Sequence, residues 1–213
     1  MLKQWIALFA SILLSSFTLA KEGAIRPGGT LSATQFRQIV HYCQTDRPRF
    51  WSLLEDIRNQ DVQITLSNER KGGPGKAVGE HRIVLSTFYL TNDLPQYPED
   101  RLIIVLLHEY GHILYNRQKA RNDQSRVANE FAAFRYSLEV AGQLAKKGDT
   151  GPLREALHRM KARSQTGRPD DPHTIALKQL MNDPLWQASI RLLANTDTSH
   201  TGTLPKTVIR HIQ

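Results

Sequence analysis

Apolar residues recur every three or four positions over much of this chain, which is the spacing of a helix with one buried face. Phe36, Ile39 and Val40 show the pattern near the N-terminal end. The spacing predicts a series of helices that together contain most of the chain. They are expected over residues 32–44, 50–57, 101–116, 125–147, 152–164 and 174–195.

Two short segments follow the two-residue period of a strand instead. In residues 61–67, apolar Val62, Ile64 and Leu66 alternate with polar residues, which predicts a half-buried strand. Residues 82–87 predict a second strand, and the glycine-rich residues 68–80 between the two predict a mobile loop. The expected fold class is therefore α+β, mostly helical with a small β-sheet.

The first twenty residues differ from the rest of the chain. Lys3 precedes an apolar run over residues 5–14, and small residues follow at Thr18 and Ala20. This order predicts a secretory signal peptide over residues 1–20, cleaved near Ala20, and hence a secreted or periplasmic protein. The alternative is an N-terminal membrane anchor, but the apolar run is shorter than the ~20 residues that a spanning helix needs.

The remaining sequence divides into a lead-in, one domain and a tail. Residues 21–30 contain glycine and proline and predict a flexible lead-in, residues 31–195 predict a single domain, and residues 196–213 predict a polar C-terminal tail. A chain of 213 residues with 40% hydrophobic and 23% charged residues has the composition of a globular protein. Its lone cysteine, Cys43, excludes an internal disulfide framework and is expected to be buried or unpaired.

The formal net charge of +8 permits anionic partners such as cell-wall material. The basic stretch at residues 154–168 is interpreted as a solvated helix face, because charge runs of this kind usually face solvent. The sequence shows no signature of a nucleic-acid-binding module, so no specific nucleic-acid partner is expected.

The sharpest chemical feature is His108-Glu109-Tyr110-Gly111-His112, an HExxH pentapeptide. It directly extends an apolar run over residues 102–107, which predicts a buried helix. Residues four apart share a helix face, so His108 and His112 can direct two imidazoles at one metal ion, and zinc suits such ligands. Glu109 beside them can accept a proton from the attacking water as a general base.

A catalytic zinc site takes a third protein ligand, and Glu130 is the candidate. It lies 18 residues after His112, on the next predicted helix, and an apolar stripe beside it indicates an inward-facing position. A short turn between two antiparallel helices would bring it next to the HExxH helix. Glu139 and Asp123 are weaker candidates for the same role.

The HEYGH motif followed by Asn129-Glu130-Phe131-Ala132-Ala133 resembles the gluzincin zinc metallopeptidases, in particular the small single-domain minigluzincins. The resemblance covers about residues 83–138. It implies a zincin-like fold for residues 31–195, one zinc ion per chain, and peptide or protein substrates.

The resemblance also implies that the strand before the motif helix is a sheet edge that pairs with extended substrate. That strand is expected to present Ile83, Val84, Leu85 and Ser86.

The sequence departs from the family pattern at Phe134, where many members carry an aspartate that orients a zinc-bound histidine. Another carboxylate or carbonyl would have to fill that role. The family also uses a side chain to stabilise the oxyanion of the tetrahedral intermediate. The candidates for this role are Tyr115, Tyr136, His158 and His173.

These features predict a secreted zinc metallopeptidase in which His108, His112 and Glu130 bind zinc and Glu109 is the base. One alternative is a non-catalytic, peptidase-like zinc protein that binds a partner or cell-wall material. Another is a membrane-tethered protein whose HExxH motif is coincidental.

Overall fold

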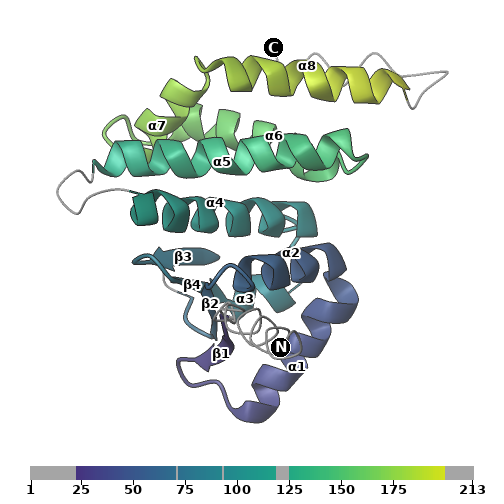
Figure 1. Cartoon of the computed structure of the whole chain (residues 1–213), viewed down its shortest axis with the longest axis vertical. Helices are drawn as coiled ribbons and strands as arrows, with labels where there is room; N and C mark the ends of the chain where they lie inside the picture. The colour runs from purple at the N-terminus through teal and green to yellow at the C-terminus, as the bar shows by residue number, and fades with distance from the viewer. Residues whose placement is uncertain (1–22, 71, 93, 119–124, 200–213) are drawn as a thin grey trace, which may run out of the picture.

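The computed structural model describes residues 23–70, 72–92, 94–118 and 125–199. It is mostly helical with a small mixed sheet, so the α+β fold class is confirmed. The helix α4 lies between the sheet on one side and the remaining C-terminal helices on the other (Figure 1). The predicted leader and most of the predicted tail lie outside the described residues.

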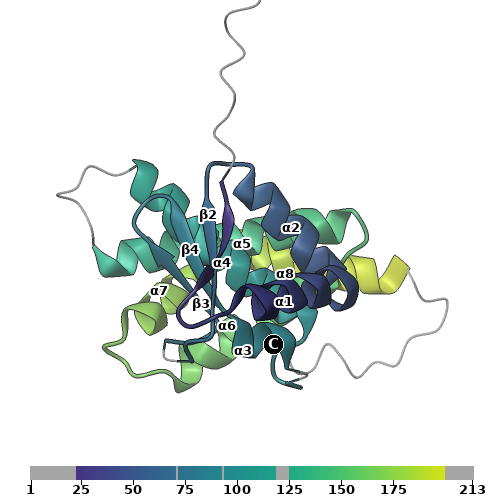
Figure 2. The ribbon, with the colours of Figure 1, turned by 90° about the horizontal axis from the view of Figure 1, so that it is seen from below.

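The N-terminal part contains the whole sheet and three helices. Their order is β1 (Ile25–Gly28), α1 (Ala33–Asp46), α2 (Pro48–Arg58), β2 (Gln63–Ser67), β3 (Gly75–Val78), β4 (Arg82–Ser86) and α3 (Thr87–Thr91). Ser32 begins α1 with a capping box shared with Gln35, and Pro48 begins α2, where its missing N–H costs no helical hydrogen bond. Figure 2 shows α1 and α2 to one side of the strands.

In the C-terminal part, the described residues form helices and no strand. The helices are α4 (Glu99–Gln118), α5 (Arg126–Lys146), α6 (Gly151–Thr166), α7 (Pro172–Leu180) and α8 (Pro184–Ser199). The single helix predicted over residues 174–195 is in fact two helices, because Pro184 lacks the N–H that would continue α7 and begins α8 instead. Within the described residues, no helix is both long and apolar enough to span a membrane.

The strand order is β1-β2-β4-β3, with β3 antiparallel to β4 and the other neighbours parallel. The prediction that the strand with Ile83, Val84, Leu85 and Ser86 forms the sheet edge is therefore wrong. β4 pairs with β2 on one side and β3 on the other, so its backbone groups are used within the sheet. The edge strand next to α4 is β3.

Two of these strands come from segments in which the sequence predicted none. β3 falls in the predicted mobile loop, and β1 falls in the predicted flexible lead-in. Both are four residues long, too short for an alternating pattern to show. Gly79, with φ of +64°, makes the turn that folds β3 back onto β4.

Two clusters of buried side chains meet at α4. The first contains Leu102, Ile103 and Leu106 of α4 together with side chains of α1, α2, β2 and β4. The second belongs to α5–α8, and Ile104 of α4 packs against both clusters. An apolar run along α4 thus holds the HExxH helix in the middle of the molecule.

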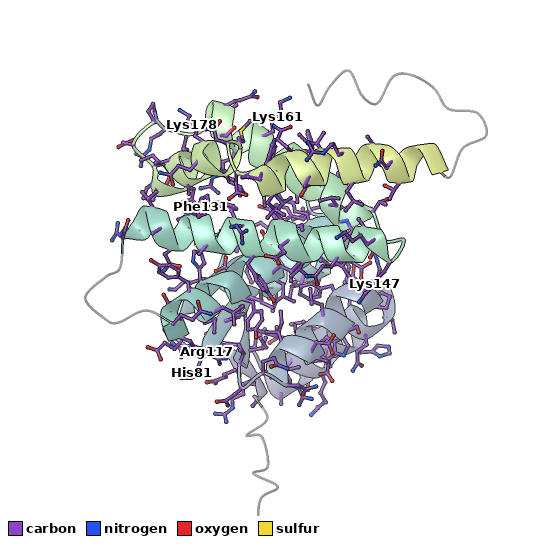
Figure 3. The ribbon with its side chains drawn as sticks, turned by 45° about the horizontal axis from the view of Figure 1, so that its top comes forward. His81, Arg117, Phe131, Lys147, Lys161 and Lys178 are labelled. Carbon is purple, nitrogen blue, oxygen red and sulfur yellow. The ribbon has the colours of Figure 1, made fainter. Side chains whose placement is uncertain are left out.

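Polar contacts fix both ends of α4. At its start, the Arg49 guanidinium of α2 lies 3.0 Å from the Glu99 carboxylate and 2.8 Å from that of Asp100. At its end, Asn116 donates to the Gly79 carbonyl at 2.8 Å and Arg117 donates to the Glu80 carbonyl at 2.8 Å. Arg117 also lies beside His81 (Figure 3). These contacts hold the β3–β4 turn against the C-terminal end of α4.

Candidate metal centre

Close approach of α4 and α5 brings the HExxH motif and Glu130 together. The two helices are sequence neighbours that pack side by side (Figure 1). At Gly111, a Cβ atom would lie 2.7 Å from the Ala133 Cα atom, well inside a normal contact. Glycine therefore allows the backbones to touch one turn away from Glu130, so that its carboxylate reaches the imidazoles.

His108, His112 and Glu130 form a group that could hold a metal ion. The two Nε2 atoms are 3.1 Å apart, and Oε2 of Glu130 lies 3.3 Å from His108 Nε2 and 3.6 Å from His112 Nε2. Tetrahedral ligands at about 2.0–2.1 Å from a metal stand roughly 3.3 Å from one another. The three ligand atoms thus have the spacing of one tetrahedral face. The buried Glu130 Oε2 has no hydrogen-bond donor among the described residues, which also fits a cation there.

A chain of amides fixes the ring of His112. Its Nδ1 lies 2.7 Å from Asn129 Oδ1, and Asn129 Nδ2 donates to Asn116 Oδ1 at 3.1 Å. Because Asn129 presents its oxygen to the ring, Nδ1 of His112 carries the proton and Nε2 keeps its lone pair for a metal. Asn129 therefore supplies the orienting carbonyl that the sequence did not locate.

His108 is held by packing rather than by a hydrogen bond. Its ring centroid lies 4.3 Å from that of Phe134, and its buried Nδ1 has no hydrogen-bond partner among the described residues. The two histidines are thus supported unequally.

Burial keeps both histidines in the form that binds metal. It lowers the pKa of His108 and, together with the neighbouring His108, that of His112. For Glu130, burial alone would raise the pKa, but the close approach of the His108 ring and the nearby histidine charges outweigh it and lower the pKa. The group is therefore two neutral imidazoles and one carboxylate near neutral pH.

Glu109 faces the edge of the sheet. Its Oε2 accepts a hydrogen bond from the Ala77 N–H of β3 at 2.7 Å. Burial raises the pKa of Glu109, although His112 and the Ala77 amide act in the opposite direction. β3 lies directly on α4, since a Cβ atom at Gly75 would come within 3.0 Å of both Glu109 and Val105.

Of the four oxyanion candidates, the structure brings only His173 to the metal centre. Its Nε2 lies 3.2 Å from Glu130 Oε1, and its Nδ1 lies 3.1 Å from Asp171 Oδ1. Asp171 caps the N-terminus of α7 and so holds the ring at the start of that helix. Burial alone would raise the pKa of Asp171, but hydrogen bonds from His173 outweigh it and lower the pKa.

The other three candidates lie elsewhere. Tyr136 stacks edge-on against Tyr110 in the first core cluster, His158 is exposed on α6, and Tyr115 does not line the cavities at the metal centre. The structure therefore does not bring these three residues to the metal centre, because helix spacing alone does not say which neighbour a helix face packs against.

The weaker ligand candidates do not join the group either. Glu139 pairs with Arg135 at 3.5 Å and is 49% exposed. Asp123 lies outside the described residues.

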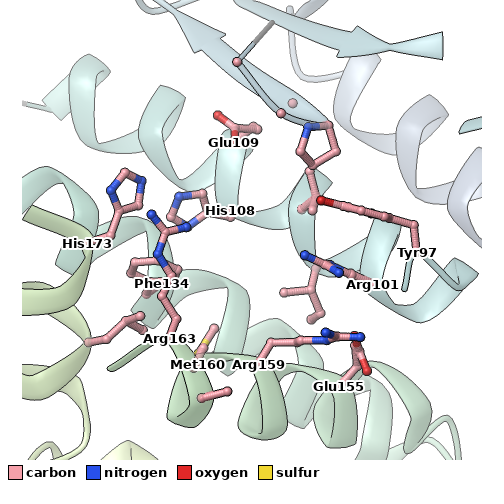
Figure 4. Close-up of a pocket in the computed structure, with 18 of the residues that line it drawn as sticks. Tyr97, Arg101, His108, Glu109, Phe134, Glu155, Arg159, Met160, Arg163 and His173 are labelled. Carbon is pink, nitrogen blue, oxygen red and sulfur yellow. The ribbon is translucent and has the colours of Figure 1, made fainter. Parts of the chain in front are cut away.

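Two hollows flank the metal centre along α4. The larger, of about 610 Å³, extends from the start of β3 across Val105 and His108 to α6 (Figure 4). The smaller, of about 340 Å³, lies on the side of His112 and Asn129. His108, Glu109 and His173 line both, so the two hollows form a groove that passes the metal centre.

Comparisons with protein-family models, with curated proteins and with solved structures each returned no significant match. What the fold and the site themselves define is an α+β protein with a His-His-Glu group, next to a carboxylate and a sheet edge. The function is therefore argued from that geometry.

Proposed function

We propose that the protein is a zinc-dependent metallopeptidase of the gluzincin type, acting outside the cytoplasm as its first twenty residues indicate. The observation that carries the proposal is the spacing of the three ligand atoms, 3.1, 3.3 and 3.6 Å, with a partly buried carboxylate on the adjacent residue. Two imidazoles and one carboxylate are a ligand set typical of catalytic zinc.

His108, His112 and Glu130 would hold the zinc ion. When bound, zinc supplies Lewis-acid polarisation of a carbonyl and lowers the pKa of water towards ~7. The chain contributes neutral imidazoles, an ionised Glu130 and a His112 ring fixed by Asn129. Each of these features favours the metal over a proton at the same atoms.

Glu109 is the general base in this proposal. Its raised pKa suits a group that takes a proton from the attacking water and later gives it to the leaving amine. The hydrogen bond from Ala77 fixes Oε2, and the Glu109 side chain lines the groove.

His173 is the oxyanion-stabilising residue in this proposal. As an imidazolium the ring donates from Nδ1 to Asp171, and its second N–H, on Nε2, is directed at the metal centre beside Glu130. A donor held in place in a cavity of this kind stabilises the charge that develops on the carbonyl oxygen.

The edge of β3 would receive the peptide backbone. Ser86 N–H donates to the Pro74 carbonyl, so the backbone groups of Pro74 face β4 and those of Gly75 and Ala77 face outwards. The Ala77 N–H accordingly points to Glu109. An extended substrate could add to this edge, which is the role first expected for residues 82–87.

The proposal predicts hydrolysis that depends on both zinc and Glu109. The purified chain is incubated with a peptide pool, with a chelator, and after zinc is restored. Cleavage should stop with chelator and return with zinc. Glu109→Gln should retain zinc but lose roughly 10²–10⁴-fold in rate, the range associated with a positioned acid–base group. Glu139→Gln, on the exposed face of α5, serves as the matched control and should cleave normally.

One observation favours a second candidate, a non-catalytic zinc-binding protein with a peptidase-like fold. Within the part of the chain that the structure describes, His108 has no hydrogen-bond partner at Nδ1, and orienting partners usually strengthen metal ligands. The same experiment separates the two candidates. If the zinc-loaded chain cleaves no peptide, or if Glu109→Gln cleaves as fast as the unmodified chain, the peptidase proposal is wrong.

A further inference from the structure

Three arginines line the larger hollow beside the metal centre. Arg101 comes from α4, seven residues before His108, and Arg159 and Arg163 come from α6. Figure 4 shows Arg163 beside His108, and Arg101 and Arg159 on the side of the hollow away from His173. Helices that are far apart in sequence thus bring several cations to the place where a substrate would lie.

The three guanidinium groups are not equally neutralised. Arg159 pairs with Glu155 at 2.7 Å, and Arg163 lies 3.4 Å from Asp171. Arg101 instead donates to the Gln96 carbonyl and lies over the Tyr97 ring, 3.8 Å from its centroid. No carboxylate among the described residues pairs with Arg101.

Arg101 is therefore a half-buried cation in direct contact with no carboxylate of the described residues, and the nearby Glu155 is already paired with Arg159. Burial, and next to it the positive charge of Arg159, lower its pKa, while Tyr97 and Glu155 act in the opposite direction. A desolvated cation beside a like charge is stabilised by an anion placed between the two. Guanidinium groups pair with a carboxylate through two parallel hydrogen bonds, which makes a carboxylate the fitting anion.

The rest of the hollow suits a short apolar stem that ends in that carboxylate. Ile104, Val105, Phe134 and Met160 contribute apolar side chains to its wall. Glu109 and His108 stand at the end nearest the metal centre, and Arg101 and Arg159 stand across the hollow. A residue seated here would lie next to the bond being cleaved.

We propose that this hollow selects substrates that carry a carboxylate next to the scissile bond, with Arg101 and Arg159 as the specificity-determining residues. The inference rests on the proposed peptidase function and names its substrate class. The carboxylate can belong to an acidic side chain or to the C-terminus of the peptide. Both present the same chemistry to the two arginines.

The test uses matched peptides that differ in one position. A peptide series places Glu, Gln or Leu at each position near the cleaved bond, and every peptide is made with a free and with an amidated C-terminus. We expect kcat/KM to be roughly 10- to 100-fold higher for the carboxylate-bearing members, which is the usual effect of a charged hydrogen bond. Dependence on Glu identifies the side chain as the source, and dependence on the free C-terminus identifies the terminal carboxylate.

Variants assign the preference to this hollow. Arg101→Gln and Arg159→Gln should remove most of it while hydrolysis of the neutral peptides continues. Arg168→Gln carries the same charge change at a side chain that is 83% exposed, and it should retain the preference. Arg101→Lys, which keeps the charge and most of the packing, should retain part of it and guards against a folding defect. The inference is overturned if Glu peptides are cleaved no faster than Gln peptides and peptides with a free C-terminus are cleaved no faster than amidated ones. It is also overturned if Arg101→Gln and Arg159→Gln both keep the full preference.

A binding measurement separates this inference from the proposed function. The Glu109→Gln chain, loaded with zinc, is titrated with fluorescent Glu and Gln peptides. Tighter binding of the carboxylate-bearing peptide, lost on adding Arg101→Gln, supports the hollow even if no peptide is hydrolysed. Equal binding of both peptides contradicts it even if hydrolysis is observed.

Discussion

Asn129 decides which nitrogen of His112 is presented to a metal. It accepts from Nδ1 at 2.7 Å and is itself held by Asn116, one helical turn after His112. Without this acceptor the ring could rotate or shift its proton to Nε2, where it would compete with the metal. At the residue scale, the strength of the site thus depends on an amide that carries no charge.

Asn129→Ala should therefore weaken zinc binding by roughly 10- to 100-fold, the usual effect of removing the partner of a metal-bound histidine. Asn129→Asp keeps an oxygen facing the ring and should lose less. Competition with a fluorescent zinc chelator measures both affinities. Equal affinity in the alanine variant and the unmodified chain would show that Asn129 does not orient the ring.

The sequence was most informative about residues that share a helix or, like Glu130, lie on the next helix, and least informative about which side chains of more distant helices meet through packing. His108 and His112 lie on one face because they are four residues apart, and that spacing was visible. His173 and Arg159 reach the same groove from α7 and α6, which no local pattern relates to α4. In the sequence, Asn129 is simply the residue before Glu130, and Asn116 lies four residues after His112. Neither position indicates that the two amides hold the His112 ring.

At the scale of elements, the contact between α4 and α5 sets the geometry of the site. Gly111 allows Ala133 to approach so closely that any side chain there would meet the α5 backbone. An α5 displaced by such a side chain would carry Glu130 and Asn129 with it. The helix pair is thus both a packing unit and the frame of the metal centre.

Gly111→Ala should destabilise the fold by about 1–3 kcal/mol, the usual cost of overpacking, although alanine favours helix more than glycine does. It should also lower zinc affinity, because Glu130 moves away from the imidazoles. Gly142→Ala on α5 is the matched control, since its Cβ would meet Leu192 at an ordinary 3.8 Å. That variant should be as stable or more stable. Urea unfolding of both, followed by zinc titration, tests the prediction, which is contradicted if Gly111→Ala behaves like Gly142→Ala.

Most helices followed from their periodic apolar faces, whereas the sheet edge did not. β3 consists of four residues beside three glycines and a proline, and it is a strand only because β4 and α4 lie on either side of it. The strand with the stronger pattern, β4, owes that pattern to burial inside the sheet. The consecutive apolar residues Ile83, Val84 and Leu85 therefore indicated an interior strand, and the edge strand β3 lay in a segment rich in turn-forming residues.

At the scale of the whole molecule, a buried group of neutral histidines links stability to pH. The pKa values of His108 and His112 lie below the usual 6.5 in the folded chain. At a pH between the folded and the unfolded pKa values of these histidines, the unfolded chain binds more protons than the folded chain. The free energy of unfolding is therefore highest above about pH 6.5, the unfolded pKa, and decreases as the pH falls below it.

The metal-free protein should accordingly lose stability as the pH falls from 7 towards 5. Thermal unfolding in the presence of a chelator measures this dependence. His108→Gln removes one titrating group and should flatten it, whereas replacement of the exposed His158 should not. A pH dependence that is identical in His108→Gln and the unmodified chain would show that His108 is not buried as a neutral ring.

The central claim is that His108, His112 and Glu130 bind one metal ion together, and zinc titration of the purified chain tests it most directly. The account predicts one zinc per folded chain, a roughly 10-fold or greater loss of affinity in Glu130→Gln, and unchanged affinity in the matched variant Glu139→Gln. A folded chain that binds no zinc, or a Glu130→Gln variant that binds zinc as tightly as the unmodified chain, would contradict it.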